Sequence, residues 1–440
     1  MKRDLLHQLR QWKDKKNRKP LIINGVRQSG KTYILKNFAE TSFPQYHYFN
    51  FEEDTRLSEL FVKDLHPKRI LDELSFYSDR PIDSTQDLIV FDEIQACPNA
   101  LTSLKYFNEI SPDIAICCAG SLLGVALSSA PYPVGKVDTF PMFPLNFHEF
   151  LLAIDEQRLA DVLQESPSQN IPLMAHEKLW EKMKWYWIVG GLPEVVATFV
   201  SEKENLYLAF EAAREKQKQL IRDYYADFAK HAGKVNAMHI DRVWRAIPQQ
   251  LAQTQDGNAN RFKFKGIVPG VDRYSRFASV INWLESAHLI IKIPIIENAQ
   301  IPLSAYTDES SFKLCMFDVG ILGALSDMPF QSILDYDFGT YKGYYAENFV
   351  AQELVAQGHS MYCWQKQRAD IEFVLQSGKH VLPIEVKSGH ITRSKSLEKF
   401  VAYYHPPIRV IASAKPLLVD KIHGIYHCPL YSVGKLKSDL

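Results

Sequence analysis

The stretch Gly25-Val26-Arg27-Gln28-Ser29-Gly30-Lys31-Thr32 decides the fold of the first part of this chain. It matches G-x-x-x-x-G-K-[ST], the loop that wraps around nucleotide phosphates. The apolar run at 21–23 predicts a buried strand before it, and apolar residues at helical spacing over 34–38 predict a helix after it. The pattern therefore predicts a phosphate-binding turn between a strand and a helix N-terminus.

Each position of this loop has an expected task. Gly25 and Gly30 allow a tight turn that points backbone N–H groups at anionic oxygens. Lys31 is expected to reach the β- and γ-phosphates, and the Thr32 hydroxyl is expected to ligate Mg²⁺. The loop supplies further expected nucleotide-binding residues, namely Arg27, Gln28 and Ser29.

A second strand end supports the same hypothesis. Residues 88–91 form a continuous apolar run, typical of a central parallel strand, and are followed by Asp92 and Glu93. In this Walker B arrangement Asp92 would hold Mg²⁺ through its water shell, and Glu93 would polarise the attacking water. An ordinary buried strand that ends in a solvated acidic pair is the alternative. With the loop, the pattern predicts ATP and Mg²⁺ as cofactors, and Glu93 and Lys31 as the catalytic residues.

A third apolar run, over 114–119, leads to Ser121. In P-loop ATPases of the AAA+ kind a polar side chain at this place senses the γ-phosphate, which makes Ser121 a candidate. A helix cap on the residues that follow is the alternative role. Lys136 is a further candidate for stabilising phosphate charge, and an ordinary surface lysine is the alternative there.

The bulk composition limits the other possibilities. A chain of 440 residues is too long for one core, so two to four domains are expected. Lys plus Arg total 51 and Asp plus Glu total 51, so any contact with nucleic acid must come from a local patch. We expect no secretory signal, no membrane span and no zinc or disulfide framework, and therefore a cytoplasmic location.

The pattern along the chain predicts an α/β multidomain protein with four parts. Residues 1–155 alternate strands with amphipathic helices, as in a parallel-sheet P-loop core of the AAA+ type. Residues 156–235 are predicted to be a helical lid or linker. Residues 236–309 follow the order of a winged helix, and residues 310–440 are predicted to form a restriction-nuclease-like α/β domain.

The predicted winged-helix unit contains a basic and aromatic segment. Its basic residues could contact the phosphates of DNA or RNA. A solvated surface, or packing of the unit against a neighbouring domain, is the alternative. The residues concerned are Arg261, Lys263, Lys265, Arg273 and Arg276.

The last part carries the second chemical signal. Strands are predicted at 369–375 and 381–387, and side chains two apart on a strand share a face. An upstream acidic residue, a strand carboxylate and a Glu-x-Lys triplet form the metal site of PD-(D/E)XK nucleases, in which carboxylates hold Mg²⁺ and the lysine helps activate the nucleophile. Acidic-x-Lys triplets are also common on ordinary strands. The predicted nuclease-like site comprises Glu347, Asp370, Glu372, Glu385 and Lys387.

Together these motifs resemble a large prokaryotic family of uncharacterised ATPases. The resemblance implies an N-terminal AAA-type P-loop core and a C-terminal domain of unknown function that ends in a nuclease-like fold. This chain departs from the family at Glu372, where relatives often carry the metal-binding aspartate. The segments that carry the resemblance are 25–32, 91–95, 119–123, 144–150, 190–194, 223–228, 317–320, 347–348 and 384–387.

Two functional hypotheses follow. In the first, ATP binding repositions the winged helix and the nuclease-like domain on DNA or RNA. In the second, the chain is a nucleotide-dependent switch that binds a protein partner and keeps an inactive nuclease-like domain as a scaffold. The pattern does not decide the oligomeric state, because no segment stands out as the source of an arginine finger.

Overall fold

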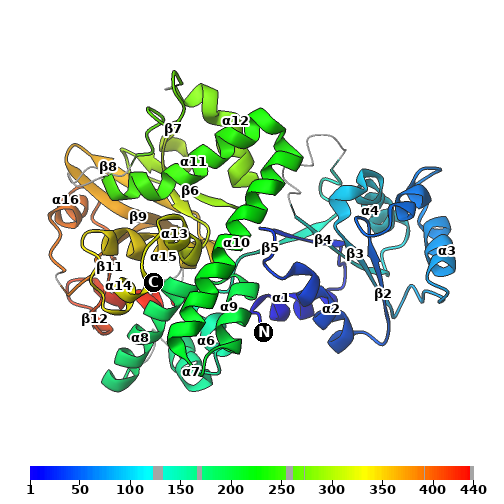
Figure 1. The fold of residues 1–440 in the computed structure, drawn as a ribbon, viewed down its shortest axis with the longest axis horizontal. Helices are drawn as coiled ribbons and strands as arrows, with labels where there is room; N and C mark the ends of the chain where they lie inside the picture. The colour runs from blue at the N-terminus through cyan, green and yellow to red at the C-terminus, as the bar shows by residue number, and fades with distance from the viewer. Residues whose placement is uncertain (122–131, 166–170, 254–260, 272, 391, 437–440) are drawn as a thin grey trace. The chain divides into compact units, whose positions relative to one another are not determined.

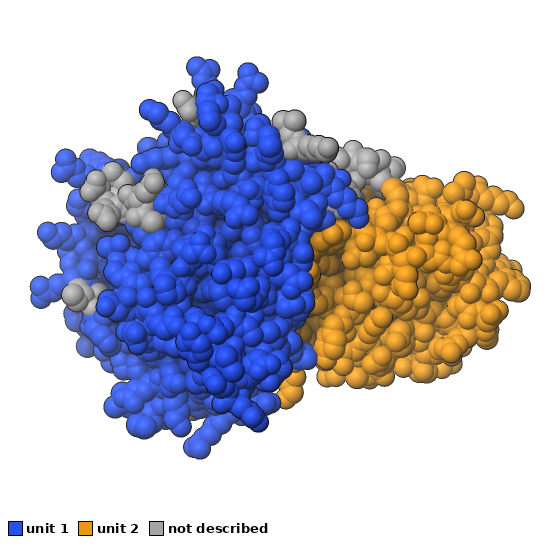
Figure 2. Space-filling model, in the orientation of Figure 1, with its two compact units in different colours: residues 1, 144–285, 289–440 blue, residues 2–143, 286–288 orange. Residues whose placement is uncertain are grey.

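The computed structural model describes residues 1–121, 132–165, 171–253, 261–271, 273–390 and 392–436. The chain divides into two compact units (Figure 2). The N-terminal unit comprises residues 2–143 with 286–288, and the C-terminal unit comprises residues 144–285 and 289–440 with Met1. The first unit corresponds to most of the core predicted over 1–155. The segments predicted as lid, winged helix and nuclease-like domain lie together in the second.

The N-terminal unit is built on a sheet of five strands in the order β2-β3-β4-β1-β5, with parallel pairing throughout (Figure 1). Its central strands are buried along their whole length, as their apolar sequences require. The strands are β1 (Leu21–Gly25), β2 (Tyr46–Asn50), β3 (Leu88–Asp92), β4 (Ala115–Gly120) and β5 (Asp138–Met142).

Alternate residues of these strands enter two different apolar cores, one on each face of the sheet. Ile89 and Phe91 of β3 pack with residues of η1, α3 and α4, whereas Leu88 and Val90 pack with residues of α1 and α2. Both faces are therefore covered, as a parallel sheet needs. The helical elements are α1 (Leu5–Lys13), α2 (Lys31–Ser42), η1 (Thr55–Phe61), α3 (Pro67–Tyr77), η2 (Ile94–Ala96) and α4 (Pro98–Ile110).

The C-terminal unit contains a mixed sheet of eight strands in the order β12-β13-β11-β10-β9-β8-β6-β7 (Figure 1). Strand β6 corresponds to the strand predicted to close the winged helix. It pairs antiparallel with β7 and parallel with β8, and so belongs to the sheet that carries the predicted nuclease-like strands. The strands are β6 (Ile290–Ile296), β7 (Thr307–Met316), β8 (Tyr362–Lys366), β9 (Ala369–Ser377), β10 (His380–Val386), β11 (Arg409–Ser413), β12 (Leu418–Asp420) and β13 (Ile425–Pro429).

Helices supply the rest of this unit. Helix α15 packs on β6, β7 and β10, and most of its residues are buried. Among the described residues, no helix combines the length and apolar character needed to cross a membrane. The helical elements are α6 (Phe147–Ala153), α7 (Gln157–Glu165), α8 (Leu173–Val189), α9 (Pro193–Ser201), α10 (Leu206–Ala232), α11 (Lys234–Gln253), α12 (Tyr274–Ser286), η3 (Leu303–Tyr306), α13 (Val319–Leu325), α14 (Phe330–Leu334), α15 (Tyr341–Ala356), α16 (Lys395–Tyr404) and η4 (Leu430–Lys435).

A buried polar joint connects the turn after α8 with the start of α13. The Gly191 N–H donates to the Asp318 carboxylate at 2.7 Å, and the same carboxylate caps α13 by accepting from the Ile321 N–H at 2.9 Å. The Gly191 carbonyl accepts from the Leu145 N–H at 2.7 Å. Burial raises the pKa of Asp318 to about 6. This joint brings together two of the segments identified above, 190–194 and 317–320.

Candidate functional site

The predicted phosphate loop connects the end of β1 to the start of α2. Gly30 lies at φ +91°, and Gly25 lies at φ +152° with no room for a side chain, since a Cβ there would fall 2.1 Å from the Met142 carbonyl oxygen. Gln28 also takes a left-handed conformation, at φ +62°. Glycine is therefore required at the two ends of this turn. Between them, the Ser29 hydroxyl donates to the Val26 carbonyl at 2.9 Å.

Lys31 is folded back over the loop that precedes it. Its Nζ donates to the Val26 carbonyl at 2.8 Å and to the Gly25 carbonyl at 3.1 Å. The side chain is buried, and burial lowers the pKa of Lys31 to about 8, although Glu93 and Asp92 act in the opposite direction. A buried ammonium at the start of a helix, next to a glycine-containing turn, is suited to an anionic ligand such as a phosphate.

Thr32 and Asp92 meet where the loop faces the end of β3. The Thr32 hydroxyl donates to Asp92 Oδ2 at 2.7 Å, and Asp92 is buried. A hydroxyl and a carboxylate are oxygen ligands of the kind that Mg²⁺ takes, so this pair fits the predicted ion. A third residue, which sequence analysis missed, also contacts this carboxylate: the Tyr48 hydroxyl donates to Asp92 Oδ2 at 2.7 Å. The parallel pairing of β2 with β3 brings it there.

Glu93 is held by a chain of side chains that begins in the phosphate loop. The Arg27 Nε donates to the Ser121 hydroxyl at 3.0 Å, and this hydroxyl donates to Glu93 Oε2 at 3.2 Å. The Gln95 amide donates to the same carboxylate oxygen. Arg27 also lies 3.7 Å from Glu52. The structure thus places Ser121 beside Glu93, while the residues that it was alternatively expected to cap, 122 and 123, lie outside the described residues.

Lys136, the weaker candidate, forms an ion pair with Glu109 at 2.9 Å. Both side chains are more than one-third exposed. This pairing agrees with the alternative of an ordinary surface lysine.

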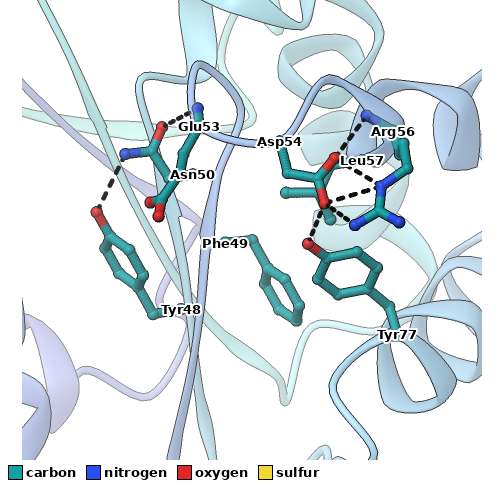
Figure 3. Close-up of a pocket in the computed structure, with 8 residues that line it drawn as sticks. All are labelled: Tyr48, Phe49, Asn50, Glu53, Asp54, Arg56, Leu57 and Tyr77. Atoms are coloured by element: carbon teal, nitrogen blue, oxygen red, sulfur yellow. Dashed lines mark hydrogen bonds and ion pairs between the residues drawn. The ribbon is translucent and has the colours of Figure 1, made fainter.

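A pocket of about 560 Å³ opens beside the end of β2 (Figure 3). Phe49 lies between Tyr48 and Tyr77, and the Tyr77 hydroxyl donates to Asp54 at 2.6 Å. Arg56 pairs with the same carboxylate at 2.7 Å. Through the Tyr48 hydroxyl, this pocket adjoins the Asp92 carboxylate.

The predicted nuclease-like residues lie on neighbouring elements of the C-terminal unit. Strands β9 and β10 are antiparallel neighbours, and the Val386 N–H donates to Glu372 Oε2 at 3.1 Å. Lys387 Nζ lies 2.6 Å from Glu385 Oε1. Burial, followed by the charges of Glu385 and Glu347, raises the pKa of Asp370 to about 6. The same three causes raise the pKa of Glu372. The five predicted side chains therefore share one electrostatic environment.

This acidic centre contains a sixth residue that sequence analysis missed. Lys313 of β7 is buried and forms an ion pair with Glu347 of α15. Within the described part of the chain, no group of three or more acidic, histidine or cysteine side chains is arranged to hold a metal ion. Glu347 is paired with a lysine that does not belong to the predicted site, so the carboxylates as arranged do not fit the divalent metal site predicted from the sequence.

The basic segment predicted to contact nucleic acid alternates between core and surface. Phe262 and Phe264 are buried against Phe312. The intervening basic side chains are exposed, as are the two that precede or open α12, so the exposed set comprises Arg261, Lys263, Lys265, Arg273 and Arg276. The strand-like alternation of this segment therefore produces a positively charged surface.

Comparison with known proteins bears most directly on the first unit. Residues 17–151 match a family model described as an AAA domain. The N-terminal unit contains an AAA-type P-loop domain. Residues 181–332 and 342–431 match two models that are each described as a domain of unknown function, DUF8612 and DUF4143. The first of these spans the boundaries predicted at 235 and 309, as does the compact C-terminal unit.

Three solved structures show distant similarity to this chain, and no curated protein matches it. A Walker-type ATPase of Pyrococcus abyssi is 14% identical, with 73% of this chain and 94% of that chain covered and a TM-score of 0.45. C. elegans PCH-2 is 12% identical, with coverages of 48% and 66% and a TM-score of 0.31. The ORC1 protein of Aeropyrum pernix, solved in complex with DNA, is 13% identical, with coverages of 75% and 92% and a TM-score of 0.25. With TM-scores below 0.5 and identities below 15%, these three structures do not indicate a function for this chain.

Proposed function

We propose that this chain is a Mg²⁺-dependent ATPase whose catalytic site lies in the AAA-type domain. The observation that carries the proposal is the convergence of Thr32 and Tyr48 on Asp92 Oδ2, each at 2.7 Å, beside the buried Lys31. An ordinary acidic strand end would not need a phosphate-type loop, a buried ammonium and two hydroxyls around one carboxylate.

The roles of the side chains follow from their positions. Loop N–H groups and Lys31 would bind the triphosphate, and Thr32 and Asp92 would hold the ion. When bound, Mg²⁺ supplies neutralisation of phosphate charge. Glu93 would orient a water molecule and accept its proton, while the Ser121 hydroxyl, 3.2 Å away, keeps the carboxylate in place.

Two variants test this proposal. Lys31→Ala should abolish ATP binding, because it removes the cation that meets the β- and γ-phosphates. Glu93→Gln should keep ATP affinity within about threefold and reduce turnover by at least 10²-fold, in line with the usual contribution of a general base. Binding is measured by calorimetry and turnover by phosphate release. Lys136→Ala, which breaks a surface ion pair, is the matched control, and unchanged ATP binding by Lys31→Ala would show that the pocket is misassigned.

We further propose that the nucleotide state is coupled to nucleic-acid binding by the C-terminal unit. The exposed basic segment around Arg261, Lys263 and Lys265 supports this proposal, since counterion release from phosphates drives such binding. Replacing these three residues with alanine should weaken DNA or RNA binding at low salt at least tenfold and reduce its salt dependence.

The control and the contrary outcome are defined by the same assay. Lys63→Ala with Lys68→Ala removes exposed charges from the other unit and should leave the affinity unchanged. If neither DNA nor RNA binds at low salt with or without ATP, the protein-binding switch replaces this proposal. Pull-down with the Glu93→Gln variant would then search for the partner.

A further inference from the structure

A buried lysine lies in the C-terminal half of β7. Lys313 is 3% exposed and stands in a run of buried residues, opposite Ile293 of β6. A buried ammonium is costly unless an anion neutralises it. Its partner is the carboxylate of Glu347, which projects from α15 across the strand.

A second ammonium neutralises the other side of the same centre. Lys387 Nζ lies 2.6 Å from Glu385 Oε1, and this glutamate is 2% exposed. Glu372 Oε2 accepts the Val386 N–H at 3.1 Å. Two of the acidic side chains predicted as metal ligands, Glu347 of α15 and Glu385 of β10, are therefore each paired with a lysine.

Lys313 lies among the carboxylates that were predicted to bind a metal ion. In a metal-dependent nuclease the divalent ion is the cation that holds such carboxylates together. Here the helix carboxylate and the strand carboxylates converge on a centre that already contains a cation supplied by the chain. Lys313 belongs to the buried part of β7, residues 312–316, and its side chain is itself buried.

We propose that the Lys313 ammonium takes the place of the divalent metal ion in the nuclease-like centre, so that this centre is metal-free and does not cleave phosphodiesters. The inference goes beyond the proposed ATPase and does not depend on it. It makes the C-terminal unit a module in which carboxylates at the positions predicted for a nuclease are held by the positive charge of a lysine side chain. Removal of that lysine should uncover a latent cation site.

The test is a Mn²⁺ titration of the nucleotide-free full chain, followed by electron paramagnetic resonance. Asp92→Asn is introduced in every sample, so that the nucleotide site contributes no signal. The sample with Lys313 present should show no site that responds to Glu372→Gln. Lys313→Met should gain one site with at least tenfold higher affinity, and Lys313→Met with Glu372→Gln should lose it again.

A thermal-unfolding readout covers the case in which Lys313→Met is poorly folded. In Lys313→Met the Glu347 carboxylate has lost its lysine partner, so Mn²⁺ should raise the unfolding temperature of this variant. The unfolding temperature of the parent should not change with Mn²⁺. A Mn²⁺ site in the parent that Glu372→Gln abolishes would overturn the proposal. So would a folded Lys313→Met variant without a new site, or Mg²⁺-dependent cleavage of DNA or RNA by the parent that Glu372→Gln abolishes.

Discussion

Replacement of Tyr48 by phenylalanine is the sharpest perturbation that the nucleotide site offers. The Tyr48 hydroxyl donates to Asp92 Oδ2 at 2.7 Å, and the Thr32 hydroxyl donates to the same oxygen at the same distance. If the Thr32 hydroxyl binds Mg²⁺ instead, Tyr48 is the one of these two hydroxyls that still donates to Asp92. Tyr48→Phe removes one oxygen atom and keeps the ring that contacts the Lys36 ammonium, 4.0 Å from the ring centroid.

The magnitude follows from the chemistry of the contact. A hydrogen bond to a charged group contributes about 1.5–3 kcal/mol, and loss of a group that orients a metal ligand typically costs about 10–100-fold in metal affinity. These two ranges agree, because each factor of ten corresponds to about 1.4 kcal/mol. Tyr48 also lines the pocket beside β2, so water can partly replace its hydroxyl. We therefore expect the Mg²⁺ concentration for half-maximal ATP turnover to rise about tenfold.

The assay is phosphate release at saturating ATP over a series of Mg²⁺ concentrations. Nucleotide affinity in the presence of EDTA should not change, because Tyr48 does not belong to the phosphate loop. Tyr46→Phe is the matched control. It removes a hydroxyl from the same strand, and this hydroxyl contacts Glu40 at the exposed surface, at 3.3 Å. This control should behave as the parent does.

Two results would refute this reasoning. An unchanged Mg²⁺ dependence would mean that the hydroxyl does not orient Asp92 in the working enzyme. A lower Mg²⁺ requirement would mean that Tyr48 competes with the ion for Oδ2 instead of positioning it.

Two further predictions concern the buried joint of the C-terminal unit. Gly191→Ala should destabilise this unit by at least about 2 kcal/mol, because the new Cβ would lie 2.1 Å from the Leu145 carbonyl oxygen. Gly343→Ala is the control, since a Cβ at Gly343 meets nothing within 4 Å. Equal unfolding temperatures of the two variants would contradict the prediction. Burial raises the pKa of Asp318 to about 6, so the folded state binds more protons than the unfolded state at mildly acidic pH and loses stability as the pH rises. Between pH 5 and 7.5, Asp318→Asn should therefore lose about 1 kcal/mol less stability than the parent in thermal unfolding, and parallel pH profiles would disprove this.

Motifs that are continuous in sequence were predicted well, for a physical reason. The phosphate loop needs glycines at two strained backbone positions, a helix N-terminus and a lysine, and all of these lie within eight residues of chain, 25–32. The Asp92 and Glu93 pair follows a strand whose apolar run can be recognised by itself. The match of residues 17–151 to an AAA domain model supports the predicted AAA-type domain, and the roles of the individual site residues stay a prediction.

Features that depend on long-range pairing could not be predicted in this way. The apolar run at 289–293 predicted a strand that closes the winged helix, but the sheet to which this strand, β6, belongs is set by the register of Ile295 and Ile296 against β8. No local period carries that information. The compact C-terminal unit therefore runs across the boundaries expected at 235 and 309, which stay a prediction.

The amino-acid sequence by itself determined the chemistry of the loop, the acidic strand end and the identity of the candidate carboxylates, because each depends on neighbouring residues and local backbone conformation. The tertiary structure decided which side chains meet them. Tyr48 reaches Asp92 from the neighbouring strand, and Lys313 of β7 meets Glu347 of α15, which lies 34 positions further along the chain. Such contacts arise from packing of distant segments, where a single buried ammonium changes the chemistry that the same carboxylates can support.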